Sequence, residues 1–170
     1  MVLHVEGLAG LRELVGQSLG VSDWLAVEQG RVDAFAEATG DRQWIHVDPE
    51  RAAAGPFGGT IAHGYLTLAL APLLLKQIWE LRGLRMSINY GLYRVRFPAP
   101  VPVGSRIRLR AILQALEEVR DGVQATVDLV QTVEDEVRRG RLKTEQDLKQ
   151  AVTRRLTEIL LVPGSDPGVL

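Results

Sequence analysis

Three histidines, at positions 4, 46 and 63, are the first candidates for acid–base chemistry in this sequence. His46 follows Asp41 by five residues, where an apolar helical pattern ending at Gly40 gives way to a stretch rich in proline and glycine. A carboxylate and an imidazole held together allow one group to accept a proton while the other donates one, which the addition or removal of water requires. The same spacing fits an aspartate that caps a turn and a histidine bonded to a backbone carbonyl, so spacing alone leaves both interpretations open.

A second candidate lies at the start of the apolar segment 60–79, where His63 and Gly64 follow two glycines and Thr60. The first turn of a helix has free N–H groups and the positive end of the helix dipole, so a carbonyl oxygen could bind there. Gly64 lacks a Cβ atom and would let a ligand approach the backbone closely. The alternative is structural: the glycines form a turn, Thr60 caps the helix, Gly64 permits tight packing, and His63 is a hydrogen-bonded core histidine.

Other chemistries find little support in the residue types. The chain has no cysteine, which excludes disulfides, thiolate zinc sites and cysteine nucleophiles, and no two histidines have a short metal-ligand spacing. The formal net charge is −1, so no global field attracts nucleic acid or an anionic membrane. A local basic cluster over two predicted strands could meet an anionic ligand or be a solvated strand face: Arg94, Arg96, Arg106, Arg108 and Arg110.

The elements that must position these residues begin with two helical patterns. Apolar spacing predicts a short helix over 8–19, a strand over 24–27 and a helix from Val32 to Thr39 that ends at Gly40. Residues 41–59 contain too much proline and glycine for regular structure and are predicted to be mostly loop. Segment 60–79 is apolar around its circumference, which is typical of a helix buried on most sides, with a bend at Pro72.

From Met86 onward the apolar period changes to two. Alternation predicts long strands over 86–97, 107–113 and 123–131, and Asp121-Gly122 is a hairpin signal between the last two. A chain of 170 residues suits one domain. Two helices, a long loop and a meander of strands therefore predict an α+β fold in which an antiparallel β-sheet wraps around a long central α-helix.

The C-terminal region breaks this pattern. After residue 137 the sequence becomes basic, and the spacing of Leu148, Val152, Leu156, Ile159 and Leu160 predicts a charged helix followed by a disordered end. We therefore divide the chain into a main domain, residues 1–137, and an atypical extension, residues 138–170. The longest apolar stretch, Tyr65–Leu75, is too short to span a bilayer and the N-terminus lacks a signal-peptide pattern, so we expect a cytoplasmic protein without membrane contact.

Three blocks in this order resemble the MaoC-like hydratase family: FAEATGDRQWIHVDP at 35–49, AAGPFGGTIAHG at 53–64 and RFPAPVPVGS at 96–105. The resemblance covers roughly residues 8–136 and is strongest to the single-domain branch typified by nodulation protein N. It implies a hot-dog fold and a homodimer with a continuous sheet. It also implies Asp41 and His46 as the catalytic pair and the N–H of Gly64 as the donor to a thioester carbonyl.

By the same resemblance the substrate is a trans-2-enoyl-CoA, hydrated to the (R)-3-hydroxyacyl-CoA, with no cofactor beyond the coenzyme A of the substrate itself. Candidate contacts to the substrate or to coenzyme A are Trp44, His63, Asn89, Arg94 and Arg96. Many family members have Asn-Pro where this chain has Gln43-Trp44, so Trp44 could narrow the pocket. The family normally ends in an apolar strand where this sequence predicts the charged helix of the extension.

Three alternatives share these residues. A dehydratase acting on acyl-carrier-protein thioesters would use the same pair and differ only in its docking surface. A non-catalytic acyl-thioester binding module would have no need of an acid and a base in one place. A hot-dog thioesterase is disfavoured, because such enzymes commonly carry a carboxylate on the central helix and Thr60–Ile78 contains none.

Overall fold

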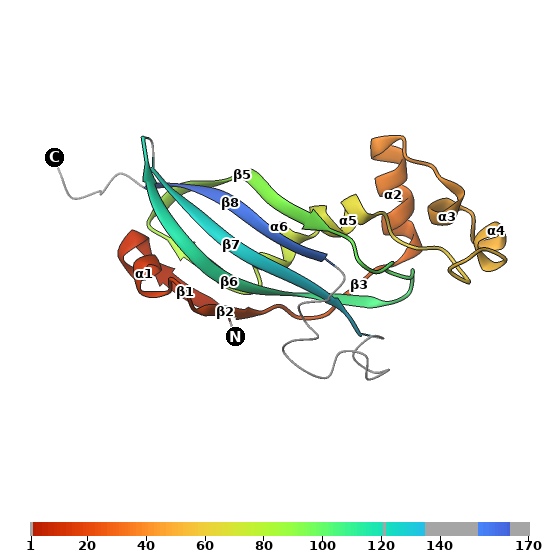
Figure 1. Ribbon diagram of the computed structural model, residues 1–170, viewed down its shortest axis with the longest axis horizontal. Coiled ribbons are helices and arrows are strands. Elements are labelled where there is room, and N and C mark those ends of the chain that lie inside the picture. The colour runs from red at the N-terminus through yellow and green to blue at the C-terminus, as the bar shows by residue number, and fades with distance from the viewer. Residues whose placement is uncertain (1, 121, 135–152, 164–170) are drawn as a thin grey trace.

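The computed structural model describes residues 2–120, 122–134 and 153–163, and it has the expected α+β architecture (Figure 1). An antiparallel sheet has the strand order β2-β6-β7-β8-β5, and β3 also pairs with β6. The strands of this sheet are β2 (Ser18–Val21), β3 (Leu25–Ala26), β5 (Leu84–Arg96), β6 (Arg106–Val119), β7 (Gly122–Val133) and β8 (Thr153–Pro163). Two short strands, β1 (Leu3–Glu6) and β4 (Trp79–Arg82), form a separate parallel pair.

Alternating side chains explain the long strands. In β6 the residues Ile107, Leu109, Ala111 and Leu113 are fully buried, whereas the arginines between them are not. Side chains two residues apart share a face of a strand, so this alternation buries one face of β6 and leaves the other toward solvent. β6 and β7 pair up to Val119 and Gly122, which confirms the predicted hairpin between them.

The central helix is shorter than predicted and is divided. The sequence predicts one helix over 60–79, but the structure has α5 (Gly64–Ala69) and α6 (Ala71–Leu75), and Trp79 belongs to β4. Pro72 lies in the first turn of α6, where its missing N–H is tolerated because first-turn N–H groups have no partner within their own helix. The predicted bend is therefore realised as a division of the helix just before the proline.

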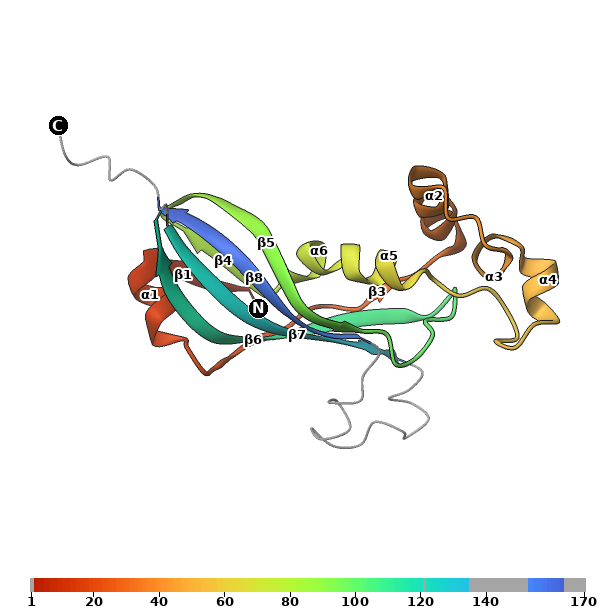
Figure 2. The ribbon, with the colours of Figure 1, turned by 45° about the horizontal axis from the view of Figure 1, so that its top comes forward.

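The core lies between this divided helix and the sheet. Leu66, Leu70 and Leu74 from the helical segment pack in one apolar cluster with residues of β6, β7 and β8 such as Leu109 and Leu161. Figure 2 shows α5 and α6 lying along the face around which the sheet curves. This is the hot-dog arrangement that the sequence predicts.

The first 40 residues differ from the predicted pattern in detail. The helix predicted over 8–19 is shorter, α1 (Gly7–Glu13), and its end is replaced by the edge strand β2. The strand predicted over 24–27 is the two-residue β3. The next helix, α2 (Gln29–Thr39), ends as predicted: Gly40 has φ 77°, a left-handed conformation that glycine adopts without strain, and its N–H donates to the carbonyl of Ala36.

The segment predicted to be mostly loop contains two short helices, α3 (Trp44–Val47) and α4 (Pro49–Ala53). Asp48 ends α3 and caps α4, because its side chain accepts a hydrogen bond from the N–H of Arg51. Pro49 follows at the first position of α4, where proline is favoured. Together with α2 these helices form a lobe at one end of the sheet, next to the start of α5 (Figures 1 and 2).

The prediction of a C-terminal helix is wrong for Thr153–Pro163. This segment is β8, which pairs with β7 on one side and with β5 on the other, so the sheet has the last strand that the sequence analysis judged missing. Ile159 and Leu161 enter the core, as alternate residues of a strand do. The boundary drawn at residue 137 therefore does not separate 153–163 from the domain, and the expectations for 138–152 and 164–170 lie outside the described residues.

No helix in the described part of the chain is long and apolar enough to cross a lipid bilayer.

Candidate active site

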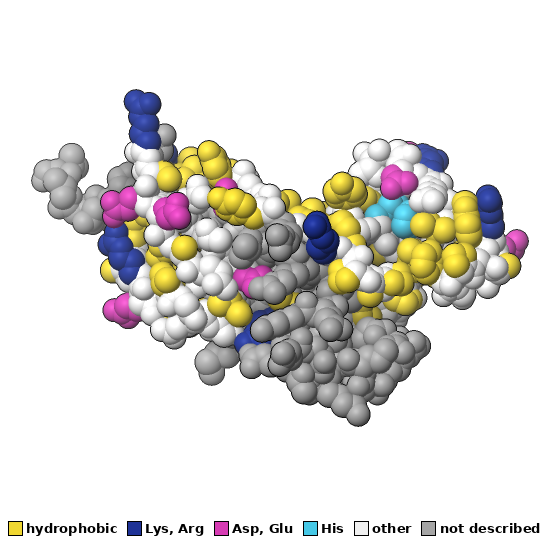
Figure 3. All heavy atoms as spheres, in the orientation of Figure 1, with side chains coloured by type: hydrophobic (Ala, Val, Ile, Leu, Met, Phe, Trp, Pro, Cys, Tyr) yellow, Lys and Arg dark blue, Asp and Glu magenta, His cyan; other side chains and the backbone are white. Residues whose placement is uncertain are grey.

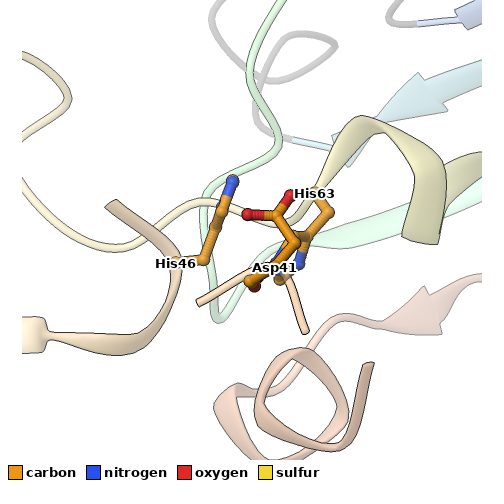
Figure 4. Close-up of side chains that lie close together, drawn as sticks. All are labelled: Asp41, His46 and His63. Carbon is orange, nitrogen blue, oxygen red and sulfur yellow. The ribbon is translucent and has the colours of Figure 1, made fainter. Parts of the chain in front are cut away.

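Asp41, His46 and His63 meet where the helical lobe joins the start of α5 (Figure 4). Asp41 directly follows Gly40 at the end of α2, His46 lies in α3, and His63 directly precedes α5. One side-chain oxygen or nitrogen of each residue lies within 4.8 Å of those of the other two. The structure thus brings the predicted acid–base pair together and adds the second histidine to it.

The hydrogen bonding of His46 determines which ring nitrogen is available. The side chain is buried, and Nδ1 lies 2.7 Å from the backbone carbonyl oxygen of Ile61. Because a carbonyl oxygen can only accept, Nδ1 carries the proton and Nε2 of the neutral ring keeps its lone pair. The backbone at His46 is held by Gln29, whose Nε2 donates to the carbonyl of His46 at 2.7 Å.

Burial lowers the pKa of His46 below its usual 6.5, because a charged imidazolium is poorly solvated there. The hydrogen bond to Ile61 opposes this effect, His63 adds to it, and the carboxylate of Asp41 opposes it. The net direction is downward, so His46 is neutral at pH 7. A neutral histidine with a free Nε2 can accept a proton.

His63 is a buried, hydrogen-bonded histidine, as in the structural alternative that the sequence left open. It is 2% exposed, and its Nε2 donates to the backbone carbonyl of Asp41 at 2.9 Å. Its ring stacks on that of His46 with the centroids 3.8 Å apart, and the ring of Phe35 lies on it at 5.0 Å. It is therefore enclosed by the site and does not point toward solvent.

A cavity of about 280 Å³ extends from His46 to the start of α5. Its lining includes His46, Phe57, Gly64, Thr67 and Phe97. Gly64 is the first residue of α5, so its N–H has no partner within that helix. In the space-filling view, histidine atoms are accessible among hydrophobic side chains on the lobe, with acidic atoms beside them (Figure 3).

Two polar residues that the sequence analysis missed hold the start of α5 in place. The hydroxyl of Thr67 donates to the carbonyl of Gly64 at 2.6 Å, and Gln131 donates from Nε2 to the carbonyl of Thr67 at 2.8 Å. Gln131 lies on β7 and is 1% exposed. The signal was a polar residue at a core-facing position of an otherwise apolar alternation. Thr60 does not cap this helix, because its hydroxyl donates to Gln29.

Trp44 has a packing role beside the site. The ring lies against Gly55, where a Cβ atom would stand 2.9 Å from two ring carbons, and the guanidinium of Arg51 lies 4.6 Å above it. Trp44 is not among the described residues that line the 280 Å³ cavity. It fixes the loop after α4 against the helix that carries His46.

The other predicted contacts are spread over the sheet. Asn89 lines a second cavity of about 410 Å³, between β5 and the face of α6 that carries Pro72. The guanidinium of Arg96 donates to the neighbouring carbonyl of Val95, and the side chain of Arg94 lies outside the described part of the structure.

The prediction that arginines of β5 and β6 form one basic cluster is wrong, because β7 and β8 lie between these two strands in the sheet. On β6, moreover, Arg106 pairs with Glu134 and Arg108 lies over the ring of Trp24. Two strands therefore separate Arg96 from the arginines of β6, and these side chains do not form one patch for an anionic ligand.

The three site residues also have the donor types of a divalent metal site, although the sequence predicts none. The stacked geometry argues against shared metal coordination by the two histidines. Imidazole lone pairs lie in the ring plane and Zn–N distances are about 2.0–2.1 Å. Two rings stacked 3.8 Å apart with an interplanar angle of 26° direct their lone pairs side by side, not toward one point.

The sequence matches the family model described as "MaoC like domain" over residues 11–135. It is 56% identical over 130 residues to 3-hydroxyacyl-thioester dehydratase Z of Mycobacterium tuberculosis. The aligned residues cover 76% of this chain and 86% of that protein. It is 50% identical over 113 residues to nodulation protein N of Rhizobium leguminosarum, covering 65% of this chain and 70% of the relative.

Among solved structures, the (R)-hydratase from A. caviae superposes with a TM-score of 0.63 at 25% identity, covering 88% of this chain and 96% of that one. A MaoC-like dehydratase from Rhodospirillum rubrum superposes with a TM-score of 0.67 at 23% identity, covering 92% and 98%. The second likeness supports the fold alone.

Proposed function

The chain belongs to the MaoC-like domain family of hydratases and dehydratases, and from this membership we propose that it hydrates trans-2-enoyl-CoA to (R)-3-hydroxyacyl-CoA reversibly. The observation that carries the proposal is the 280 Å³ cavity, which His46 and Gly64 both line, with Asp41 directly beside His46. The proposed base and the first residue of α5, the proposed donor, therefore lie on one space, which supports the proposal.

In the proposed reaction, water is held between the Asp41 carboxylate and Nε2 of His46. Nε2 accepts a proton from the water as its oxygen attacks C3, and the acid–base pair returns a proton to C2, so that H and OH are added across the double bond. The neutral ring of His46 supports this direction, because burial lowers its pKa and the bond to Ile61 leaves Nε2 unprotonated. Dehydration is the reverse sequence.

The N–H of Gly64 is proposed to bind the thioester oxygen. Negative charge grows on this oxygen as C3 is attacked, and a fixed donor stabilises such charge strongly. The bonds from Thr67 to Gly64 and from Gln131 to Thr67 support the proposal, because they restrict movement of the donor. This chemistry needs no cofactor beyond the coenzyme A of the substrate, and we propose none.

We also propose that the active form is a homodimer joined at β5. This strand is the last in the sheet order, so its outer edge has no partner strand in the described sheet. Several of its apolar side chains are exposed: Met86, Ile88, Tyr90, Leu92 and Tyr93. An exposed, long and apolar edge strand is a template for pairing with another chain, and a second copy paired antiparallel would continue the sheet.

The test is the hydration of crotonyl-CoA, followed by the loss of enoyl-thioester absorbance, with chiral analysis of the product. Asp41→Asn and His46→Gln are compared with the matched exposed controls Asp23→Asn and His4→Gln. We expect activity in the wild type and both controls, and a collapse in both site variants. The same acyl group on an acyl carrier protein tests the carrier. A folded wild type that acts on neither thioester would overturn the catalytic proposal in favour of a binding module.

A further inference from the structure

His63 makes contacts that no step of the proposed reaction uses. Nε2 donates to the backbone carbonyl of Asp41, and the ring stacks on His46 with 3.8 Å between centroids. On the other side the ring of Phe35 lies on it at 5.0 Å. Among the described residues that line the cavity, His46 is present and His63 is not, so His63 does not itself face the proposed substrate site.

The backbone at Asp41 needs an external support. Asp41 lies between the end of α2 at Thr39 and the start of α3 at Trp44, in a connection with no helix or strand of its own. Its carbonyl accepts the hydrogen bond from His63, a residue 22 positions later, and its N–H donates to the hydroxyl of Thr39 at a longer 3.4 Å. The position of the carboxylate therefore depends on a contact from the segment before α5.

The same side chain restricts His46. The bond from Nδ1 to Ile61 fixes one edge of the His46 ring, but a ring held at one atom can still tilt. Stacking on His63, with an interplanar angle of 26°, limits this tilt. Because His63 is also joined by a peptide bond to Gly64, one residue connects the carboxylate, the imidazole and the proposed oxyanion donor.

The hydrogen bonding of His63 is consistent with such a role. The Asp41 carbonyl can only accept, so Nε2 of His63 carries a proton. Nδ1 is buried and has no hydrogen-bond partner among the described residues. The charged or titratable groups that face the ring are the Asp41 carboxylate and His46, while Phe35 on the third element is apolar.

We propose that His63 is a positioning residue that holds Asp41 and His46 at the separation the attacking water requires. It fixes the Asp41 backbone through Nε2–H and the His46 ring through stacking. The inference rests on the proposed function of these two residues. A displacement of about 1 Å in a catalytic group can cost about 100-fold in rate, so loss of this support should lower kcat and leave KM nearly unchanged.

Two variants separate the two contacts. His63→Phe keeps a ring for stacking and removes the donor, whereas His63→Gln keeps an N–H donor and removes the ring. We expect His63→Phe to lower kcat about 10- to 100-fold, with partial recovery in His63→Gln. Circular dichroism and thermal melting establish that each variant is folded. Folded variants that both keep kcat within about twofold of the wild type would overturn the proposal.

A second measurement does not depend on activity. The chain has three histidines, so the ring signals in an NMR titration can be assigned by substitution. His63 lowers the pKa of His46 through charge repulsion, which a phenylalanine cannot exert, and we therefore expect the His46 titration to move to higher pH in His63→Phe. An unchanged titration would contradict the electrostatic coupling of the two histidines. If the wild type hydrates no thioester but this shift occurs, the proposed function fails and the structural link between the two histidines stands.

Discussion

The ring of Phe97 packs directly on Gly64. A Cβ atom on residue 64 would stand 2.9 Å from two ring carbons of Phe97, closer than real Cβ contacts allow. Both residues line the cavity beside His46, and Tyr65 packs edge-on against the same ring with the centroids 6.0 Å apart. Of the two interpretations left open by the sequence, tight packing at Gly64 is therefore observed, and the approach of a ligand to its backbone stays a prediction.

Gly64→Ala is expected to lower kcat/KM by about 100- to 1,000-fold, as the loss of one oxyanion donor does. The added methyl group must move Phe97 or the backbone of the first helical turn, and either movement misplaces the N–H. Gly59→Ala is the matched control, because its Cβ meets no atom within 4 Å. Steady-state hydration of crotonyl-CoA by the two folded variants is the measurement, and equal activity in both would contradict the assigned role of Gly64.

The pH profile should report the buried state of His46. Burial lowers its pKa below 6.5, so the base stays neutral, and kcat/KM stays level, down to pH values where an exposed histidine would already be protonated. Activity is then lost as the pH falls through the lowered pKa. An acid limb at or above pH 6.5 in the wild type would show that another group controls the reaction.

The same shift has a consequence for stability. The unfolded chain, with His46 at its ordinary pKa of 6.5, binds more protons than the folded chain between that pH and the lowered folded value. The contribution of His46 to stability is therefore complete above pH 6.5 and decreases as the pH falls through this window. Urea midpoints of the wild type should fall more steeply across it than those of His46→Gln, and parallel curves would argue against the shift.

Two neighbouring leucines test whether 153–163 forms a strand. Leu161 is 0% exposed and packs in the core, whereas Leu160 is only partly buried on the other face of β8. Leu161→Ala should lower the free energy of unfolding by about 2–5 kcal/mol, and Leu160→Ala by less than half as much. Chemical denaturation provides the comparison. Equal losses, or none at Leu161, would be incompatible with the pairing of β8.

The dimer is tested at the two edges of the sheet. Leu92 on β5 is 50% exposed, and Val21 on β2, the opposite edge, is 48% exposed. Arginine at an apolar contact between two copies must be desolvated without a partner, so Leu92→Arg should convert the dimer to monomers. Val21→Arg should leave the dimer intact. Sedimentation velocity gives both masses, and a Leu92→Arg dimer as tight as the wild type would place the interface elsewhere.

The sequence by itself predicted the elements whose pattern is local. In β6, successive side chains point to opposite faces of the strand, so the alternation of buried and less buried residues can be predicted from the sequence. The helix α2 ends at Gly40 because glycine adopts the left-handed conformation easily. The site was predicted from the resemblance to a family, because Asp41, His46 and Gly64 lie in the sequence blocks that carry it. The structure brings Asp41 close to His46 and places His46 and Gly64 on one cavity.

Only the tertiary structure decided which distant segments are neighbours. The spacing of Leu156, Ile159 and Leu160 fits a helix, but the segment lies between β5 and β7, where pairing on both sides makes it a strand. The same strand order separates the arginines of β5 from those of β6. The contacts of His63 with Asp41 and of Gln131 with Thr67 join residues 22 and 64 positions apart. Local periodicity cannot encode such contacts, because they depend on how the sheet curves around the helix and on which strands it places side by side.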